Sequence, residues 1–90
     1  MKVYLIEYGR KAEKQLAAIL DRRLSLQLKS AIGSLATAPR PPGVVKMAGM
    51  KDHWRIRVGE WRVVYRVEDG RLVVVVVAVG GRGGVAALGG

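Results

Sequence analysis

The stretch from residue 53 to residue 67 constrains the fold more strongly than any other part of the sequence. It reads H-W-R-I-R-V-G-E-W-R-V-V-Y-R-V, with apolar and mostly basic residues alternating on both sides of Gly59-Glu60. Alternation with a period of two is typical of a β-strand that buries one face. A glycine at the first of two central positions favours a two-residue hairpin loop. The stretch therefore predicts an antiparallel hairpin closed by Gly59-Glu60.

The register of this hairpin separates its side chains onto two faces, because successive residues of a strand point to opposite sides. The loop predicts the pairs Val58–Trp61, Arg57–Arg62, Ile56–Val63, Arg55–Val64, Trp54–Tyr65 and His53–Arg66. One face is then apolar and is expected to join the core: Trp54, Ile56, Val58, Trp61, Val63 and Tyr65. The other face, which we call the arginine face, holds His53, Arg55, Arg57, Arg62, Val64 and Arg66.

The arginine face predicts an anion-binding site. Arg57 opposite Arg62 is unfavourable by a few tenths to about 1 kcal/mol, and Glu60 and Glu68 lie in or near turns instead of beside the pair. Guanidinium groups bind phosphate through two hydrogen bonds and stack on bases. The net charge of +9, from 16 Lys and Arg against 7 Asp and Glu, also favours acidic partners such as nucleic acid. A solvated basic face without a ligand is the alternative.

The remaining chain predicts a helical region framed by further strands. Apolar residues recur at helical spacing from residue 10 to residue 37, and Asp21 is a suitable N-cap where this run breaks into two antiparallel helices. The R-P-P-G sequence at residues 40–43 predicts a rigid turn. The expected strands cover residues 2–8, 44–47, 54–58, 61–67 and 72–79.

The last expected strand follows Asp69-Gly70, a dipeptide that favours a second two-residue hairpin. That loop predicts the pairs Tyr65–Val74, Val64–Val75 and Arg62–Val77. The arginine face then also contains Val73, Val75 and Val77. Because this strand is apolar on both faces, we expect it at a central position of a mostly antiparallel sheet.

Composition excludes several classes of site. The chain has no cysteine and a single histidine, which excludes disulfides and makes us expect neither a metal nor a cofactor. The longest apolar run, residues 72–79, is far shorter than the roughly 20 residues that a membrane span needs. Glu7 interrupts the first apolar run too early for a signal peptide. We therefore expect a cytoplasmic protein that does not associate with membranes.

Three motifs connect the chain with a known family. W-R-I-R-V-G-E-W-R-V-V-Y at residues 54–65 is close to the pattern Y-R-I-R-x-G-x-Y-R-x-x-Y, and L-x-x-x-P and K-M-A-G occur at residues 35–39 and 46–49. Over nearly its whole length the sequence resembles the RelE/ParE superfamily of bacterial and archaeal toxins, and in particular its RelE-like branch. The resemblance implies one toxin domain over residues 1–90, with a glycine-rich tail at residues 79–90. The expected fold class is α+β, a small RelE-like β-α-α-β-β-β fold with a helical hairpin packed on a mostly antiparallel twisted sheet.

The resemblance also implies a function, that of a toxin in a type II toxin–antitoxin system, held by an acidic antitoxin in a hetero-oligomer. RelE-like members cut mRNA in the ribosomal A site, whereas ParE-like members poison DNA gyrase. The basic cluster of the RelE-like branch falls on Arg55, Arg57, Arg62 and Arg82, which favours a ribosome-dependent mRNA endonuclease with ribosome and mRNA as partners. Gly81 and Ala86 stand where many RNase members have His and Tyr. A gyrase inhibitor and a weakened member that mainly binds its antitoxin are therefore the alternatives.

These implications assign roles to individual residues. Cleavage without a metal would use the 2′-hydroxyl of the RNA as nucleophile, while cations stabilise the phosphoryl oxygens. The expected catalytic residues are Arg55, Arg57, Arg62, Arg82 and His53. We expect RNA contacts from Lys46, Lys51 and Arg66, and contacts to an amphipathic antitoxin segment from Val64, Val73, Val75 and Val77. Because arginine stays protonated, the candidates for proton transfer are His53 and Glu60.

Overall fold

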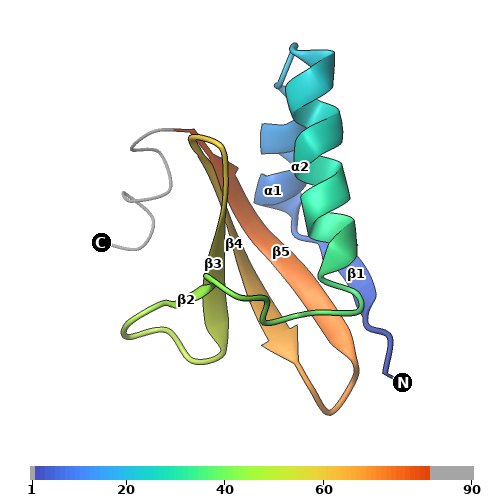
Figure 1. The fold of residues 1–90 in the computed structure, drawn as a ribbon, viewed down its shortest axis with the longest axis vertical. Helices are drawn as coiled ribbons and strands as arrows, with labels where there is room; N and C mark the ends of the chain where they lie inside the picture. Colours follow the sequence, from blue (N-terminus) through green and yellow to red (C-terminus); the bar gives the residue numbers. More distant parts are fainter. Residues whose placement is uncertain (1, 82–90) are drawn as a thin grey trace.

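Two helices cover one side of a five-stranded sheet in the computed structural model, which describes residues 2–81 (Figure 1). The elements along the chain are β1 (Leu5–Tyr8), α1 (Arg10–Ala17), α2 (Arg22–Ser34), β2 (Val45–Lys46), β3 (His53–Val58), β4 (Trp61–Glu68) and β5 (Val73–Gly80). The strand order is β1-β5-β4-β3-β2, in which β1 and β5 are parallel and all other neighbours are antiparallel. This arrangement confirms the predicted α+β class with a helical hairpin on a mostly antiparallel sheet.

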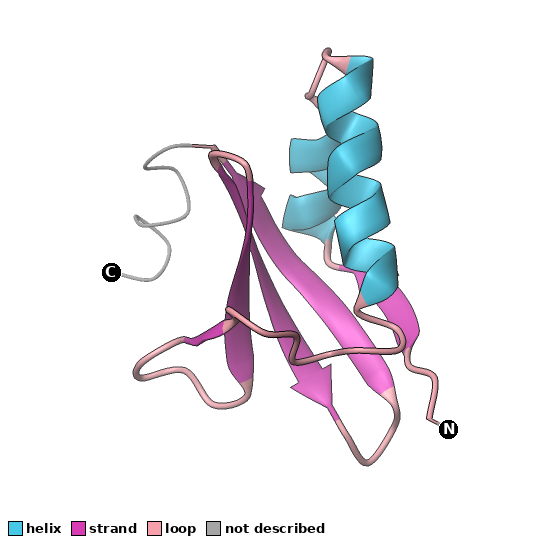
Figure 2. Cartoon of the chain, in the orientation of Figure 1, coloured by secondary structure: helices cyan, strands magenta, loops and turns pink. Residues whose placement is uncertain are grey.

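The helical region breaks at Asp21, as predicted. The Asp21 carboxylate accepts hydrogen bonds from the backbone N–H groups of Arg23 and Leu24 at 3.0 and 3.3 Å, which caps the start of α2. Both helices lie on the same side of the strands (Figure 2). Their buried residues are four positions apart in each case, Ala12 and Leu16 in α1 and Leu28 and Ile32 in α2. This spacing places one apolar stripe of each helix against the sheet.

The hairpin of β3 and β4 has the predicted register. Val58 pairs with Trp61 and Arg57 pairs with Arg62, and the pairing continues without a shift to the far end of β3. Gly59 has a φ of +62°, a conformation that glycine adopts without steric cost. The two-residue loop therefore sets the faces of both strands.

The apolar face of this hairpin packs against the helices. Ile56, Val63 and Tyr65 are buried in the same core cluster as the helix residues, and Trp54 and Trp61 pack half-buried at its margin. Their positions confirm the prediction that both tryptophans belong to the core face. The arginine face is consequently the side of the sheet that the helices leave uncovered.

The predicted pairing of β4 with β5 is wrong at the turn. Four residues separate the strands instead of two, because Glu68 pairs with Val73. Leu72, and not Gly70, takes a left-handed conformation, with a φ of +54°. The longer turn also places the Leu72 carbonyl where the Leu5 N–H donates to it at 2.8 Å, so that β1 can continue beside β5.

A β-bulge at Val77 adds a second shift between the same two strands. Tyr65 pairs with Val76, but the preceding residue, Val64, pairs with Ala78. The observed pairs are Tyr65–Val76, Val64–Ala78 and Arg62–Gly80, in place of Tyr65–Val74, Val64–Val75 and Arg62–Val77. The two-residue shift preserves the faces of Val73 and Val75, since the side-chain period is also two, whereas the bulge changes the face of every residue beyond it.

The central position predicted for the last strand is confirmed, since β5 lies between β1 and β4. Beyond the end of β1, the Val79 N–H donates to Oε1 of Gln15 in α1 at 2.6 Å. A helix side chain thus replaces the missing strand as hydrogen-bond partner. No helix within residues 2–81 is long and apolar enough to cross a membrane. Arg82 and the rest of the predicted tail beyond Gly81 lie outside the described residues.

Candidate functional site

Three arginines gather at one end of the arginine face. Arg57 and Arg62 lie opposite each other beside the β3–β4 loop, and Arg55 lies two residues before Arg57 on β3. All three alternate with the core-facing Ile56 and Val63, so they project from the uncovered side of the sheet. Within residues 2–81, no carboxylate forms an ion pair with any of them. The site therefore presents positive charge that the described part of the chain does not neutralise.

The guanidinium of Arg57 is oriented by its own loop. Its Nε donates to the Gly59 carbonyl at 2.9 Å, which leaves the N–H groups of both terminal nitrogens for other acceptors. Arg55 and Arg62 are half-buried and make no side-chain hydrogen bond to residues 2–81. Planar N–H pairs of this kind bind phosphate through two parallel hydrogen bonds.

An apolar floor lies beside the arginines. Val64 and Ala78 are 2% and 0% exposed, and the half-buried side chains of Met47 and Val77 pack against them. The bulge explains this cluster, because it places Val77 and Ala78 on the same face of β5. Low-polarity surroundings strengthen the attraction between a guanidinium and a phosphate.

His53 lies on the arginine face at the other end of β3. Its Nδ1 is 2.7 Å from the Lys51 carbonyl oxygen. A carbonyl only accepts hydrogen bonds, so this contact places the proton of a neutral imidazole on Nδ1 and leaves Nε2 as a proton acceptor. His53 pairs with Arg66 across the strands. The side chain is thus held in one tautomer, as a general base requires.

Arg66 differs from the other arginines of this face because it is neutralised. Its guanidinium donates to the Glu68 carboxylate at 2.9 Å, and Arg71 donates to the other oxygen of the same carboxylate at 2.9 Å. The hydrogen bonds from Arg66 and then from Arg71 lower the pKa of Glu68. Two strand residues on the same face, two positions apart, form this pair.

The two lysines with expected RNA contacts lie apart from the arginine cluster. Lys46 pairs with Trp54, so its side chain lies on the helix side of the sheet, with Nζ 5.8 Å from the centre of the indole ring. Lys51 is exposed in the loop before β3, where its carbonyl orients His53. A binding surface that used both lysines with Arg62 would have to extend around the edge of the sheet.

The four valines with an expected antitoxin contact differ in how much surface they offer. Val64 and Val73 are only 2% and 4% exposed. Val75 and Val77 are half-buried and retain exposed apolar surface. Leu5 of the neighbouring β1, which pairs with Val73, is 62% exposed and extends this apolar strip toward the edge of the sheet.

A cluster that the sequence reasoning missed holds the R-P-P-G turn against the sheet. The Asp69 carboxylate accepts from Tyr4 Oη at 2.7 Å and from Arg40 at 2.8 and 3.2 Å, and the Tyr65 hydroxyl donates to the Pro39 carbonyl at 2.6 Å. Hydrogen bonds from Arg40 and then Tyr4 lower the pKa of Asp69 to about 2, whereas burial raises the pKa of Tyr65 to about 12. Tyr65 is therefore unsuited to proton transfer. These partners are distant in sequence, and no local pattern relates them.

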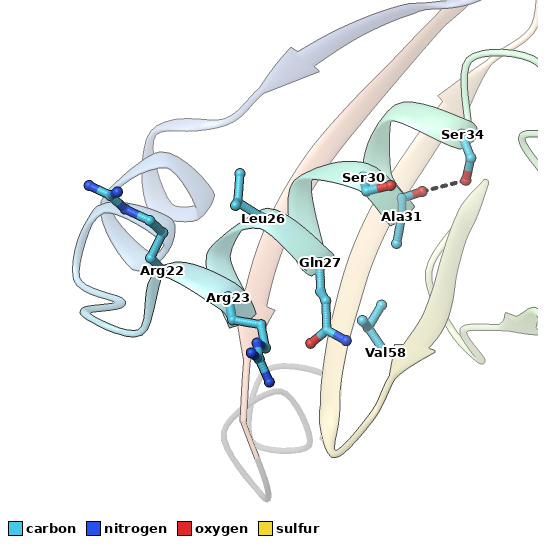
Figure 3. Close-up of a pocket in the computed structure, with 8 residues that line it drawn as sticks. All are labelled: Arg22, Arg23, Leu26, Gln27, Ser30, Ala31, Ser34 and Val58. Carbon is cyan, nitrogen blue, oxygen red and sulfur yellow. Dashed lines mark hydrogen bonds between the residues drawn. The ribbon is translucent and has the colours of Figure 1, made fainter.

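A separate groove lies on the helix side, between α2 and the end of β3 (Figure 3). It has a volume of about 760 Å³, and its lining residues are Arg22, Arg23, Leu26, Gln27, Ser30, Ala31, Ser34 and Val58. Leu26 is 60% exposed, while the Ser34 hydroxyl donates to the Ala31 carbonyl at 2.7 Å. The lining contains no histidine, carboxylate or tyrosine, which suits binding but not acid–base chemistry.

The arrangement of the arginine face can bind an anion and supply one imidazole base. Within the described range, no three His, Asp or Glu side chains come together as a set of metal ligands. Arg55, Arg57, Arg62 and His53 share one face, as predicted from the alternation. The fourth predicted arginine, Arg82, lies outside the described residues.

Comparison with known proteins relates the chain to toxins. The model of a family described as the ParE toxin of the type II toxin-antitoxin system, parDE, matches residues 6–85. No curated protein sequence matches the chain.

Solved structures of toxins share the fold. The chain is 30% identical to an isolated E. coli RelE toxin, with a TM-score of 0.71. The match covers 94% of this chain and 92% of the RelE chain. The intact E. coli RelBE toxin–antitoxin complex matches at 28% identity and a TM-score of 0.75, over 88% of this chain and 95% of that one. The archaeal RelE–RelB complex of Pyrococcus horikoshii OT3 matches at 23% identity and a TM-score of 0.78, over 91% and 98%. The last of these supports the fold alone.

Proposed function

The chain belongs to the ParE toxin family of type II toxin–antitoxin systems, within the RelE/ParE superfamily, and we propose that it is a ribosome-dependent mRNA endonuclease that inhibits translation. The observation that supports this most directly is the cluster of Arg55, Arg57 and Arg62. These side chains share the uncovered face of the sheet, and no carboxylate within residues 2–81 pairs with them. A polyanion is the ligand that such a cluster fits best.

In the proposed reaction the 2′-hydroxyl of one nucleotide attacks the adjacent phosphorus. The bond to the 5′-oxygen of the next nucleotide breaks, which leaves a 2′,3′-cyclic phosphate and a 5′-hydroxyl. Arg57 and Arg62 would stabilise the charge that develops on the phosphoryl oxygens, and Arg55 would hold a neighbouring phosphate. Solvent water would accept the proton of the 2′-hydroxyl and protonate the leaving 5′-oxygen, because His53 lies four residues before Arg57 on β3, about 14 Å away at 3.4 Å per residue. Arg82 is a further proposed cation of the same site.

The antitoxin is the second proposed ligand of this face. Membership in a type II system implies an antitoxin partner, and two of the similar structures are toxin–antitoxin complexes. We propose that an acidic segment of it forms a hetero-oligomer with the toxin, covering the exposed parts of Val75 and Val77 and pairing with the free arginines. Such a segment would block RNA by occupying the same cations.

A gyrase-inhibiting toxin is the second candidate function, because the matching family model is that of the ParE toxin. A member that mainly binds its antitoxin is the third alternative, suggested by Gly81 and Ala86 at positions where many RNase members have His and Tyr; Ala86 lies outside the described residues. At position 81 an added Cβ would lie 3.5 Å from the Trp61 ring, which belongs to the helix side of the sheet. The side chain of a histidine at position 81 would leave the backbone on the helix side of the sheet, whereas Arg62 lies on the arginine face. Glycine at this position therefore removes no group from the arginine face.

Induction in cells followed by mapping of mRNA 5′ ends on translating ribosomes tests the proposal. We expect cleavage by the parent chain, and a loss of about 10²-fold to 10³-fold when Arg62→Ala removes a stabilising cation. Arg10→Ala is the matched control, because it removes the same charge from an exposed position at the start of α1. Growth arrest with induction of the DNA-damage response and intact mRNA would instead establish the gyrase alternative.

A further inference from the structure

The net charge of the arginine face falls from positive to about zero along the strands. Following the pairings from the β3–β4 loop outward, the successive rows are Arg57–Arg62–Gly80, Arg55–Val64–Ala78, His53–Arg66–Val75–Glu7 and Glu68–Val73–Leu5. The first two rows contain only cations and apolar residues. The last two contain both carboxylates of this face. The sheet therefore has a cationic end at the loop and, beside β1, an end where carboxylates balance the arginines.

Glu68 is the residue that makes the difference between the two ends. Its side chain is 25% exposed, and its carboxylate accepts from both Arg66 and Arg71 at 2.9 Å, so that one acid engages two cations. Glu7 is exposed on β1, where it pairs with Val75 in the same row as Arg66. A phosphate placed on Arg66 would therefore meet the Glu68 carboxylate, whereas Glu7 lies two strands away, at about 10 Å.

We propose that the Glu68 end is a boundary that fixes where single-stranded RNA lies, so that the RNA backbone contacts Arg55, Arg57 and Arg62 and stops before Arg66. This inference rests on the proposed function. Arg66 becomes an RNA contact only when Glu68 no longer engages it. The boundary would restrict the bound segment to the two rows nearest the loop, and so determine which phosphate lies between Arg57 and Arg62.

The range of electrostatic interactions makes the boundary local. Glu68 lies six residues beyond Arg62 on β4, which is about 20 Å at 3.4 Å per residue. The screening length is about 8 Å at physiological ionic strength. Glu68 therefore influences a phosphate at Arg66, two residues away, but hardly one at Arg62. A change at Glu68 should extend the bound segment without altering the contacts near the loop.

The test measures binding of the full chain to uridine oligonucleotides of graded length with 2′-O-methyl groups, which prevent cleavage. Fluorescence anisotropy over a series of salt concentrations gives the slope of log K against log salt. Glu68→Gln should steepen this slope by about 0.7, the contribution of one phosphate on a single strand. It should also lengthen the shortest oligonucleotide that reaches full affinity. Surface ion pairs contribute little to stability, so the fold is expected to persist.

Glu13→Gln is the matched control, because it makes the same change of charge at an exposed position in the first turn of α1. If the two variants steepen the slope equally, net charge alone acts and the boundary is overturned. If neither steepens it, no phosphate reaches Arg66 when Glu68 loses its charge, and the boundary is overturned as well. Arg62→Ala separates this inference from the proposed function. Weakened binding in Arg62→Ala beside an unchanged slope in Glu68→Gln overturns the boundary alone. Undiminished binding in Arg62→Ala overturns both.

Discussion

The helix side of the sheet and the loop end of the arginine face differ in how their polar groups are satisfied, although Trp54 Nε1 on the helix side is buried without a partner within residues 2–81. On the helix side, the Tyr65 hydroxyl donates to the Pro39 carbonyl, and Gln15 accepts from the Val79 N–H. On the arginine face, Arg55 and Arg62 have no hydrogen-bonding partner for their side chains within residues 2–81. A polar group that is satisfied internally stabilises the fold, whereas one that is left free is available to a ligand. The comparison indicates that stability depends on the helix side and binding on the arginine face.

Truncation in the helix-side core should have the largest effect on stability. Leu28 is fully buried between α2 and the sheet. Leu28→Ala should lower the free energy of unfolding by about 2–5 kcal/mol, because it removes buried apolar surface and leaves a cavity. Urea denaturation measures the change. Leu20→Ala, at a side chain that is 97% exposed, should stay within about 0.5 kcal/mol of the parent. Equal effects at the two positions would contradict the assigned core.

The hydrogen bond between α1 and β5 should have the next largest effect. Gln15→Leu leaves the Val79 N–H without its acceptor, which should cost about 1–3 kcal/mol. Gln15→Glu keeps an oxygen at the same reach and should retain most of the stability. Hydrogen exchange of the Val79 amide gives a local readout in both variants. Faster exchange in Gln15→Glu to the same extent as in Gln15→Leu would show that the oxygen is not the important group.

The cluster around Asp69 should make stability depend on acid pH. The pKa of Asp69 is about 2 in the folded chain, below the value of about 3.9 for an unfolded aspartate. The ionised folded form is thus favoured above pH 4, and its contribution is lost as the pH falls from about 4 to 2. Asp69→Asn should flatten this part of the pH dependence of the urea midpoint. Asp52→Asn, the same substitution at an exposed position without an ion pair within residues 2–81, should keep the parent's pH dependence.

The two hairpins show which features of the fold follow from local sequence. The β3–β4 register could be predicted because Gly59 can take a positive φ at the first loop position, and nothing else competes with that loop. The β4–β5 register could not, because Leu72 takes the positive φ and β1 holds its carbonyl. Contacts with a strand that is distant in sequence thus overrode the turn preference of Asp69-Gly70.

The candidate site divides in the same way. Alternation sufficed to place Arg55, Arg57 and Arg62 on one face, since the period of a strand is two. That Arg66 pairs with Glu68 was open to prediction too, because residues two positions apart on a strand share a face. The face on which Lys46 lies could not be predicted, because a strand of two residues has no alternating pattern that sets its register.

The smallest expected effect is a gain in stability, whereas the preceding substitutions in the core and in the α1–β5 hydrogen bond are expected to lower stability. It tests directly whether the arginine face favours binding over stability. Arg57 and Arg62 are directly opposed like charges, so Arg62→Gln should raise the free energy of unfolding by a few tenths to about 1 kcal/mol while mRNA cleavage falls. A double-mutant cycle with Arg57→Gln isolates the repulsion, because the second substitution should then bring no further gain. Urea denaturation of the four proteins measures it. Additive changes in stability would mean that the two guanidinium groups do not repel each other, and that the arginine face is not destabilised in favour of binding.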